Sequence, residues 1–343
     1  MDGVLVIDKP QGLTSHDVVA TARRALRESR IGHTGTLDPL ATGVLPLAVG
    51  RATRLVRFLM SSDKDYLATI RFGATTDSYD ADGEETSRSD RHPDQVAVDA
   101  ALANLRGRYE QLPPAFSAKK VAGRRAYDMA RRNEEVTLAP VPVEVTRADV
   151  VAFDGWSVQI AVTCSAGFYV RSFAHDLGEA VGTGAYLAAL QRTRSGEFRL
   201  EEATSLDDLY GDADARRARE GTREAVLDWL IPMGQLLQDL PAVVVTEEGR
   251  VWVGHGRELG PAQYQLSTRN SQLPIANFQT PTSKVQSPES KVQSPESEAP
   301  EPAARGPKPD ASWVRVFDGA GHLLALATPG NSPGSLHPAV VLN

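Results

Sequence analysis

The 343-residue sequence predicts an α+β fold followed by a small β domain. Segments typical of strands and helices follow one another in mixed order, without the strict alternation that builds a doubly wound parallel sheet. From about Leu240 onward, short strands and turns replace this mixture. A stretch rich in Pro, Ser, Glu and Lys, with a tandem repeat at 283–296, interrupts these last strands. Because it could bury little apolar area, it is predicted to be disordered.

These changes in character predict two domains. The first covers residues 1–238 and includes a basic excursion at about 110–136, which opens with Pro-Pro. The second covers residues 239–343 and is interrupted by the low-complexity insert at about 264–310. Because the insert interrupts a small domain, we expect its two ends to lie close together.

The N-terminal half begins with the apolar run 3–8, which predicts a strand ended by a turn. A helix is predicted over 14–29, where Thr14 and Asp17 have the spacing of a capping box. The alternating segment 66–73 ends at a glycine and predicts a second strand.

The remaining elements follow from the same signals. Helices are predicted at 92–107, at 168–182 with Gly182 after the last turn, and at 185–193. Strands are predicted as a pair at 143–153 and 157–167, and again at 195–204. In the second domain, short strands and turns are predicted over 242–259 and 312–329.

Composition restricts the classes of protein that fit. The single cysteine, Cys164, excludes an internal disulfide and fits a reducing compartment. The N-terminus lacks the basic start and apolar core of a signal peptide, and no apolar run approaches the ~18 residues of a membrane helix. We therefore expect a cytoplasmic protein without a membrane partner. The seven histidines form no i, i+4 pair and have no cysteine partner, so no metal site is predicted.

Charge is unevenly distributed along the chain. The net charge of −7 argues, taken alone, against a nucleic-acid-binding protein. Residues 1–60, however, carry eight Lys and Arg against five acids, and a second basic cluster lies in the excursion. Because phosphate binding depends on local potential, a locally basic surface can bind a nucleic acid despite the acidic total.

The segment Gly32–Gly43 is the most unusual part of the chain. Gly and Thr account for six of its twelve residues, and it holds one acid, Asp38, directly before Pro39. A proline favours extended backbone at the residue before it, and glycines allow close approach to a ligand. The segment would thus present one carboxylate on a rigid loop. The alternative is an ordinary turn in which Asp38 bonds its own backbone.

A single carboxylate limits the chemistry. Glycoside hydrolysis requires two carboxyl groups and a metal hydrolase requires a ligand cluster. A lone nucleophilic carboxylate instead requires a cationic partner and an aromatic wall for a planar substrate. Without further information, Tyr66 at a strand start is expected to be a half-buried core residue, and Arg171 in a helix is expected to form a surface or structural ion pair.

Five segments in register carry a resemblance to a known family. They are DKPQGLTSHDVV, GHTGTLDPLATGVL, KDYLATIRFG, PPAFSAKKVAGRRAYDMAR and GFYVRSFAHDLG. Together, from residue 3 to about 200, they resemble the bacterial tRNA pseudouridine-55 synthases. This resemblance implies a mixed, mainly antiparallel sheet flanked by helices. It also implies isomerisation of one uridine in the TΨC loop of tRNA, without cofactor or metal. Residues 239–343 resemble, more weakly, the PUA-like β domain that follows the catalytic domain in this family.

The resemblance assigns roles to individual residues. Asp38 falls on the catalytic nucleophile, and Arg171 falls on the arginine that pairs with it. Tyr66 falls on the tyrosine that stacks on the flipped uracil and is a candidate for moving a proton. By register, Leu190 matches the apolar residue under the target base, although the local sequence LAALQRTRSG departs from the more usual double-arginine form.

Other positions are implied to support the loop or bind RNA. Lys9 and Pro10 match a Lys-Pro motif that supports the active-site loop, and His33 matches a residue that packs on displaced loop bases. The basic excursion supplies four expected RNA contacts: Lys119, Lys120, Arg124 and Arg125.

Two alternatives stay open at this level. The chain could bind and remodel the tRNA elbow as a folding module, or it could modify another RNA. Nothing in the sequence requires more than a monomer.

Overall fold

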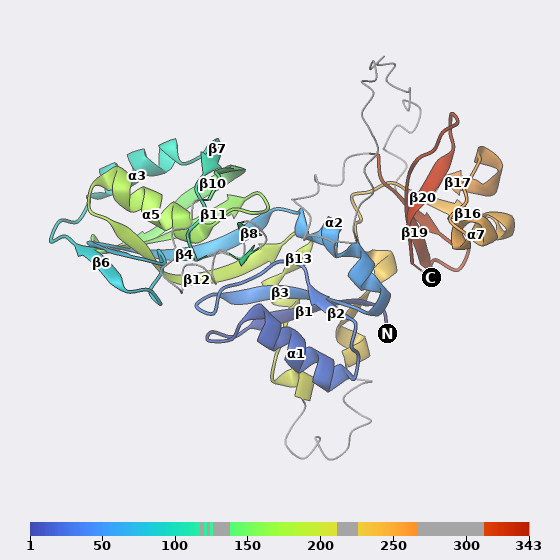
Figure 1. Ribbon diagram of the computed structural model, residues 1–343, viewed down its shortest axis with the longest axis horizontal. Helices are drawn as coiled ribbons and strands as arrows, with labels where there is room; N and C mark the ends of the chain where they lie inside the picture. Colours follow the sequence, from blue (N-terminus) through green and yellow to red (C-terminus); the bar gives the residue numbers. More distant parts are fainter. Residues whose placement is uncertain (117–119, 122–123, 126–137, 211–225, 267–311, 343) are drawn as a thin grey trace. The chain divides into compact units, whose positions relative to one another are not determined.

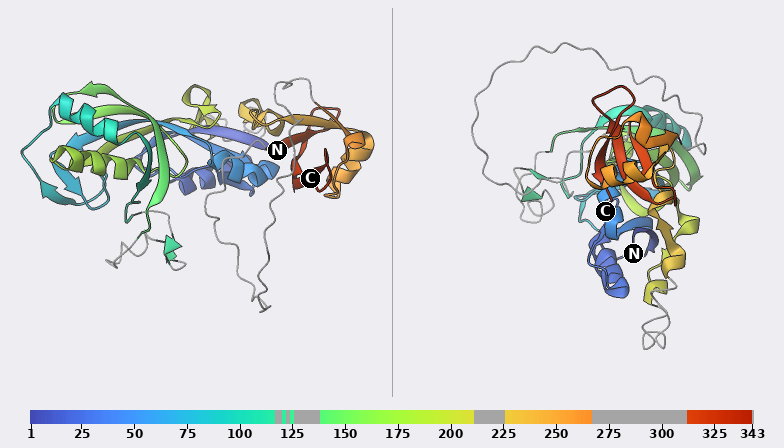
Figure 2. Two further views of the ribbon diagram at one scale, coloured as in Figure 1. Left: turned by 90° about the horizontal axis from the view of Figure 1, so that it is seen from above. Right: turned by 90° about the vertical axis from the view of Figure 1, so that its right-hand side faces the viewer.

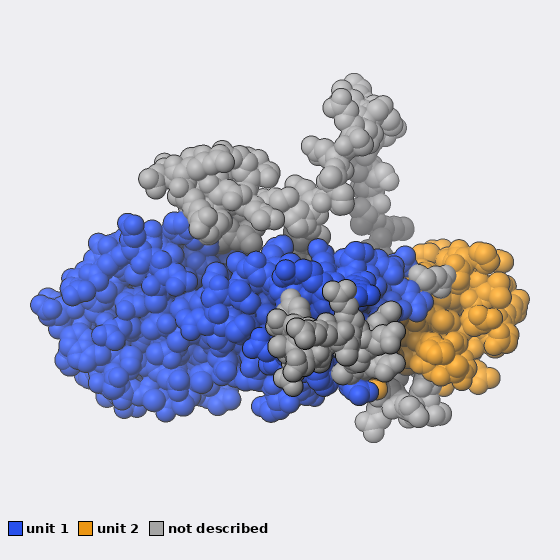
Figure 3. All heavy atoms as spheres, turned by 90° about the horizontal axis from the view of Figure 1, so that it is seen from below, with its two compact units in different colours: residues 1–231 blue, residues 232–343 orange. Residues whose placement is uncertain are grey.

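A computed structural model describes residues 1–116, 120–121, 124–125, 138–210, 226–266 and 312–342. The chain divides into two compact units, residues 1–231 and 232–343 (Figure 3). Each unit has its own sheet and its own apolar core.

The first unit is built on an eleven-stranded sheet among the described residues. Its main order is β14-β1-β3-β12-β4-β11-β10-β7, with β2 beside β3, β13 beside β12 and β15 beside β1 (Figure 1). The pairs β1–β14 and β3–β12 are parallel, and the other pairs along this order are antiparallel. The predicted α+β class, with its mixed and mainly antiparallel sheet, is therefore confirmed.

The strands of this sheet have the following bounds: β1 Gly3–Lys9, β2 Ile31–His33, β3 Thr42–Val49, β4 Lys64–Phe72, β7 Gly107–Gln111, β10 Val141–Phe153, β11 Ser157–Cys164, β12 Ala185–Ser195, β13 Phe198–Arg199, β14 Thr204–Ser205 and β15 Leu230–Pro232. Two small hairpins lie outside it, β5 Ala74–Thr76 with β6 Glu85–Arg88 and β8 Lys120–Val121 with β9 Arg124–Arg125.

The helices of the first unit begin and end where the sequence signals lie. In α1 (Ser15–Leu26) the capping box of Thr14 and Asp17 is present, and Arg27 ends the helix in a left-handed conformation. The helix α3 (Gln95–Asn104) packs against α5 (Val170–Val181), which lies on β12 and β4 (Figures 1 and 2). Gly182 closes α5 with a φ of 73°, as predicted. The short α2 (Val56–Met60) follows the 3₁₀ turn η1 (Gly50–Leu55).

The predicted helix at 185–193 is wrong, because these residues form the central strand β12. Leu and Ala are good helix formers, and they suggested a helix. Two β-bulges, between Leu187 and Ala189 and between Arg192 and Arg194, break the alternation that would have indicated a strand. Pairing with β3 and β4 on either side outweighs the local propensity.

The strand predicted at 195–204 is also only partly correct. It contains the two-residue β13, then the 3₁₀ turn η2 (Leu200–Glu202), and it ends at the start of β14. The backbone N–H of Arg199 donates to the Glu202 carboxylate, and this capping contact favours a turn. A further 3₁₀ turn, η3, covers Asp208–Tyr210.

The described residues of the second unit form a five-stranded sheet in the order β17-β16-β18-β19-β20. Its elements are η4 Met233–Gln235, β16 Ala242–Val245, α7 Glu247–Gly254, η5 Pro261–Gln263, β17 Tyr264–Leu266, β18 Val314–Phe317, β19 Leu323–Pro329 and β20 Leu336–Val341. The predicted small β domain is confirmed, but the helix α7 corrects the prediction of strands and turns only. Thr246 caps α7 by accepting a hydrogen bond from the Gly249 N–H.

Parts of two sequence predictions lie outside the described residues. They are Lys119 with most of the basic excursion, and almost all of the low-complexity insert. Lys120, Arg124 and Arg125 lie in the β8–β9 hairpin.

Candidate active site

The loop 34–41, which carries Asp38, is anchored on both sides of that residue. The Ser15 hydroxyl at the start of α1 accepts a hydrogen bond from the Leu37 N–H at 2.8 Å and donates to the Leu37 carbonyl at 3.1 Å. On the other side, the Gly12 N–H donates to the Pro39 carbonyl at 2.8 Å. The backbone around Asp38 is therefore fixed, and its side chain is left to point toward another element.

The Asp38 carboxylate contacts the guanidinium of Arg171 on α5. Arg171 Nε lies 2.9 Å from Asp38 Oδ2, and Arg171 Nη2 donates to Oδ1 at 3.3 Å. Two adjacent donors thus bind both carboxylate oxygens, the fork geometry that only arginine offers. The Arg171 side chain is 8% exposed, whereas that of Asp38 is 40% exposed. The carboxylate is held from one side and open on another.

A second carboxylate reaches the same guanidinium from the loop 77–84. Asp80 Oδ2 lies 3.5 Å from Arg171 Nε, and the Asp80 side chain is 7% exposed. The same loop supplies the Ser78 carbonyl, which accepts from Arg171 Nη1 at 3.3 Å, and Phe116 supplies another carbonyl at 2.9 Å from Nη2. Because each guanidinium nitrogen has a partner, the orientation of Arg171 is fixed from several directions.

Tyr66 and Leu190 share one face of the sheet. Tyr66 on β4 pairs directly with Arg192 on β12, and two residues along, Ala68 pairs with Leu190. Residues two apart in a strand point to the same face, so these side chains form one patch. Burial raises the pKa of Tyr66 to about 12; the charge of Arg192 opposes this shift and the charge of Asp38 adds to it. The phenol therefore lies within electrostatic reach of Asp38.

Arg192 is buried at the centre of the sheet, where it joins β12 to the neighbouring backbone. Its Nε donates to the Val44 carbonyl at 2.7 Å and its Nη2 to the Gly35 carbonyl at 3.2 Å. Gly43, with a φ of 95°, lies so close that a Cβ there would be 2.3 Å from the Arg192 carbonyl oxygen. Arg192 thereby connects the strand position opposite Tyr66 to the backbone on both sides of Asp38, at Gly35 and Val44.

Lys9 lies at the end of β1 beneath the same loop. Its ammonium donates to the Pro10 carbonyl at 2.8 Å and to the Pro39 carbonyl at 3.4 Å, and the residue is fully buried. Burial lowers the pKa of Lys9 to about 8, an effect that the nearby Asp38 charge partly opposes. This position supports the loop through its backbone.

His33 ends β2, just before the loop. Its ring lies edge-to-face against that of His16, with 5.5 Å between the centroids, and burial lowers its pKa to about 4. Among the described residues, the buried His33 Nδ1 and Thr34 Oγ1 have no hydrogen-bond partner.

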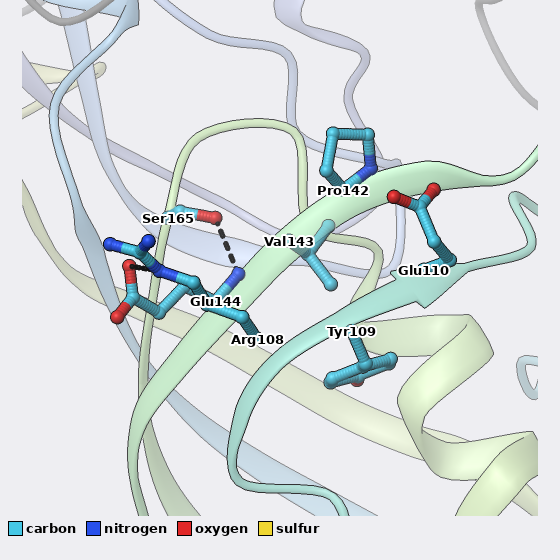
Figure 4. A pocket seen from close by; sticks show the side chains of 7 residues that line it. All are labelled: Arg108, Tyr109, Glu110, Pro142, Val143, Glu144 and Ser165. Carbon is cyan, nitrogen blue, oxygen red and sulfur yellow. Dashed lines mark hydrogen bonds and ion pairs between the residues drawn. The ribbon is translucent and has the colours of Figure 1, made fainter.

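A separate hollow of about 520 Å³ lies over β7 and β10 (Figure 4). Arg108 and Glu144 form an ion pair across it at 3.2 Å, and the Glu144 N–H donates to the Ser165 hydroxyl. The hollow is lined by Arg108, Tyr109, Glu110, Pro142, Val143, Glu144 and Ser165. None of these is a site residue predicted from the sequence.

Sequence reasoning missed two members of the site. Asp80 lies in a polar turn, and Arg192 lies in a segment that suggested a helix. The Ser78 hydroxyl donates to Asp80 Oδ1 and the Glu84 N–H donates to Asp77 Oδ1, but Asp and Ser in such contacts indicate only a turn. The pairing of β4 with β12, which brings Arg192 beside Tyr66, had no local signal.

Two family models match most of the first unit. The model described as TruB family pseudouridylate synthase (N terminal domain) matches residues 23–170. The model described as tRNA pseudouridylate synthase B C-terminal domain matches residues 171–238. The chain is also 44% identical over 266 residues to the tRNA pseudouridine synthase B of Solibacter usitatus, covering 77% of this chain and 88% of that protein. The chain belongs to the TruB family of pseudouridylate synthases.

Other TruB relatives are similarly close. The tRNA pseudouridine synthase B of Mycobacteroides abscessus is 42% identical over 266 residues, covering 76% of this chain and 85% of that protein. That of Mycobacterium leprae is 48% identical over 217 residues, covering 60% and 68%.

The fold also resembles solved structures. One is entitled "Structure of H/ACA RNP bound to a substrate RNA containing 2'-deoxyuridine", with a TM-score of 0.67, 23% identity, and 99% of this chain and 85% of that chain covered. Another is a Cbf5-Nop10-Gar1 complex, with a TM-score of 0.67, 24% identity, and 99% and 85% covered. At such identities the likeness concerns the fold.

No helix among the described residues combines the length and apolar character that a membrane crossing would require. Within the same residues, no three His, Cys, Asp or Glu side chains are grouped as they would be around a metal ion.

Proposed function

We propose that this TruB-family chain isomerises uridine 55 in the TΨC loop of tRNA to pseudouridine, with Asp38 as the nucleophile. The observation that carries the proposal is the half-exposed Asp38 carboxylate held by the fork of the buried Arg171. The names of the relatives support tRNA as the substrate class. The reaction breaks the bond between uracil and ribose, rotates the base and rejoins it through carbon.

In this proposal the target uridine must leave the RNA loop before Asp38 can reach it. Flipping a nucleotide costs a few kcal/mol. Stacking of the uracil on Tyr66 would return about 1–3 kcal/mol of that cost. Leu190, 8% exposed and on the same sheet face, would contact the base from below. The patch is thus suited to hold a planar base beside the carboxylate.

The protonated state of the Tyr66 phenol supports different roles for Tyr66 and Asp38. With a pKa of about 12, Tyr66 keeps its proton at neutral pH and can act as a hydrogen-bond donor. Asp38 would attack while Arg171 holds it in place and balances its charge. Whether the attack is on the ribose or on the base does not alter these roles.

The RNA partner in this proposal is the TΨC arm of tRNA. RNA of this kind is recognised by shape, stacking and backbone contacts. His33, at the base of the loop 34–41, would pack against displaced bases, and Lys9 would support the loop. The basic excursion with Lys119, Lys120, Arg124 and Arg125 would contact phosphates. The proposal requires no cofactor or metal and needs only a monomer.

An assay for pseudouridine on unmodified tRNA transcript, with wild type and Asp38→Asn side by side, tests the proposal. We expect wild type to modify position 55 and the variant to lose catalysis while it still binds tRNA. Pseudouridine formation at the wild-type rate by Asp38→Asn would contradict the role of the nucleophile.

The two alternative functions predict other results. A protein that only binds and folds tRNA would form no pseudouridine in either form. If the enzyme acts on another RNA, deleting its gene would change a modified site elsewhere and leave position 55 as it is in wild type. Mapping modified sites in total RNA from a deletion strain separates that case. An unchanged position 55 in the deletion strain would overturn the proposed substrate.

A further inference from the structure

Tyr79 has an unusual backbone conformation in the loop that carries Asp80. Its φ is 65°, in the left-handed region that a bulky side chain rarely adopts. Its ring stacks on the imidazole of His175, with 4.0 Å between the centroids and 29° between the planes. A conformation of this kind persists only where the surrounding structure fixes it.

The backbone around Tyr79 is fixed on the strand β12. The Leu187 N–H donates to the Tyr79 carbonyl at 3.0 Å, and the Ala81 N–H donates to the Leu187 carbonyl at 2.9 Å. Asp80, between these two bonds, forms a parallel bridge with Leu187. The loop is therefore attached to the sheet by its backbone and to α5 by the Tyr79 ring.

The helix α5 presents the two partners of this loop one turn apart. Arg171 and His175 are four residues apart, and such residues lie on the same side of a helix. Consecutive loop residues thus contact consecutive turns: Tyr79 contacts His175, and Asp80 lies 3.5 Å from Arg171. A shift of the ring along α5 would move the Asp80 carboxylate relative to the guanidinium.

We propose that Tyr79 and His175 are positioning residues whose stacked rings keep Asp80 against Arg171, so that the guanidinium stays aligned on Asp38. The inference rests on the proposed function, because alignment matters only if Asp38 is the reacting group. Both rings act on Asp38 only indirectly, through the loop 77–84. An aromatic pair of this kind contributes enough to change a rate by up to about tenfold.

The test measures single-turnover pseudouridine formation and tRNA affinity separately. Tyr79→Ala and His175→Ala should each lower the rate about tenfold and leave the affinity within about twofold. Tyr79→Phe, which keeps the ring, should form pseudouridine at the wild-type rate. The double Ala variant should be no slower than either single variant, because the same stack is lost once.

Two further variants separate the loss of the stacked ring from backbone strain at Tyr79 and from the loss of an aromatic contact elsewhere. Tyr79→Gly adopts the left-handed conformation freely but has no ring, so it should be as slow as Tyr79→Ala. The matched control is Trp156→Ala, which removes another ring–imidazole contact of the first unit, that with His92 at 5.0 Å between centroids. Its rate should equal that of wild type.

Four results would overturn the inference: a wild-type rate for Tyr79→Ala or Tyr79→Gly, a fall in affinity that accounts for the whole loss, additive effects in the double variant, or an equal loss in Trp156→Ala. Should wild type itself form no pseudouridine, the proposed function fails, and amide exchange in the loop 77–84 tests the stack directly. Faster exchange in His175→Ala than in wild type supports the stack, and unchanged exchange overturns it.

Discussion

Two loops bring an aspartate to the same arginine, and they differ in how they do so. Asp38, on the loop 34–41, lies 2.9 Å from Arg171 Nε and is 40% exposed. Asp80, on the loop 77–84, lies 3.5 Å from the same atom and is 7% exposed. The exposed carboxylate can meet a substrate, whereas the buried one can only hold the guanidinium. Under the proposed function, exposure, more than proximity to a cation, would distinguish the reacting acid from the supporting one.

The hydrogen-bond partners of the two carboxylates support the same distinction. Both oxygens of Asp38 contact Arg171. Asp80 Oδ1 instead accepts from the Ser78 hydroxyl at 2.5 Å and from the Asp82 N–H at 3.2 Å, which leaves one oxygen for Arg171. Asp80 is thus bound within its own loop, whereas the Asp38 carboxylate contacts, among the described residues, the Arg171 guanidinium on α5.

Neutralising each acid in turn gives the largest expected effects. Asp38→Asn should lower the rate of pseudouridine formation by about 10⁴-fold or more, as loss of a nucleophile does. Asp80→Asn should lower it by about 10–100-fold, because Arg171 keeps its fork on Asp38. Single-turnover rates on tRNA transcript measure both. Equal losses would contradict the distinction drawn from exposure.

Replacing the shared arginine tests whether the fork matters. Arg171→Lys keeps the positive charge but cannot bind two carboxylates and two carbonyls at once. We expect the rate to fall by about 100-fold with little change in tRNA affinity. A parallel fall in affinity, measured by filter binding, would show that Arg171 acts on RNA and not on Asp38.

Acid should destabilise the protein through the strand that leads into the loop 34–41. The pKa of His33 is lowered to about 4 in the fold and is about 6.5 in the unfolded chain, so the unfolded state binds the proton first. The stability contribution is complete above pH 6.5 and is lost as pH falls toward 4, by about 3 kcal/mol. Denaturant unfolding of wild type and His33→Asn across this range measures it. If both proteins lose stability equally, His33 is not the source.

The smallest effects should come from the serines that support each loop. Ser15→Ala leaves the Leu37 N–H and carbonyl without their partner, and we expect a loss of about 1–2 kcal/mol in unfolding free energy. Ser78→Ala removes one neighbour of Asp80, and a loss of about 1 kcal/mol is expected. Thermal unfolding measures both. A larger loss in Ser78→Ala would reverse the order.

Much of the fold was predictable because its signals are local. The capping box of Thr14 with Asp17 and the closing Gly182 both act within one helical turn, and both helices were predicted. The strand β3 lacked such a signal, because Pro46 lies within it and a proline argues against a central strand. The Pro46 carbonyl accepts from the Thr34 N–H, so the residue also helps to hold the loop.

The site was less accessible to local reasoning. Asp38 and Arg171 are 133 residues apart, and no spacing rule relates them; only the resemblance to a family connected them. Asp80 shares its guanidinium, but a polar turn gives no sign of that use. Arg192 was hidden because bulges removed the alternation of β12. In α7, Gly249 and the branched residues Val251 and Val253 masked the cap at Thr246.

The bulge at Thr193 determines what kind of genetic change this strand can survive. Arg192 pairs with Tyr66 and Arg194 with its neighbour Asp65, so the extra residue turns the two arginines to opposite sides. An in-frame deletion of Thr193 would leave Arg192 and Arg194 adjacent, and adjacent strand residues face opposite sides, so both pairings would be kept. A one-residue deletion in a regularly paired part of the strand would instead turn its neighbours to the other face. Among relatives that carry this strand, a one-residue difference in length should therefore be found at the bulge and not in the regularly paired parts.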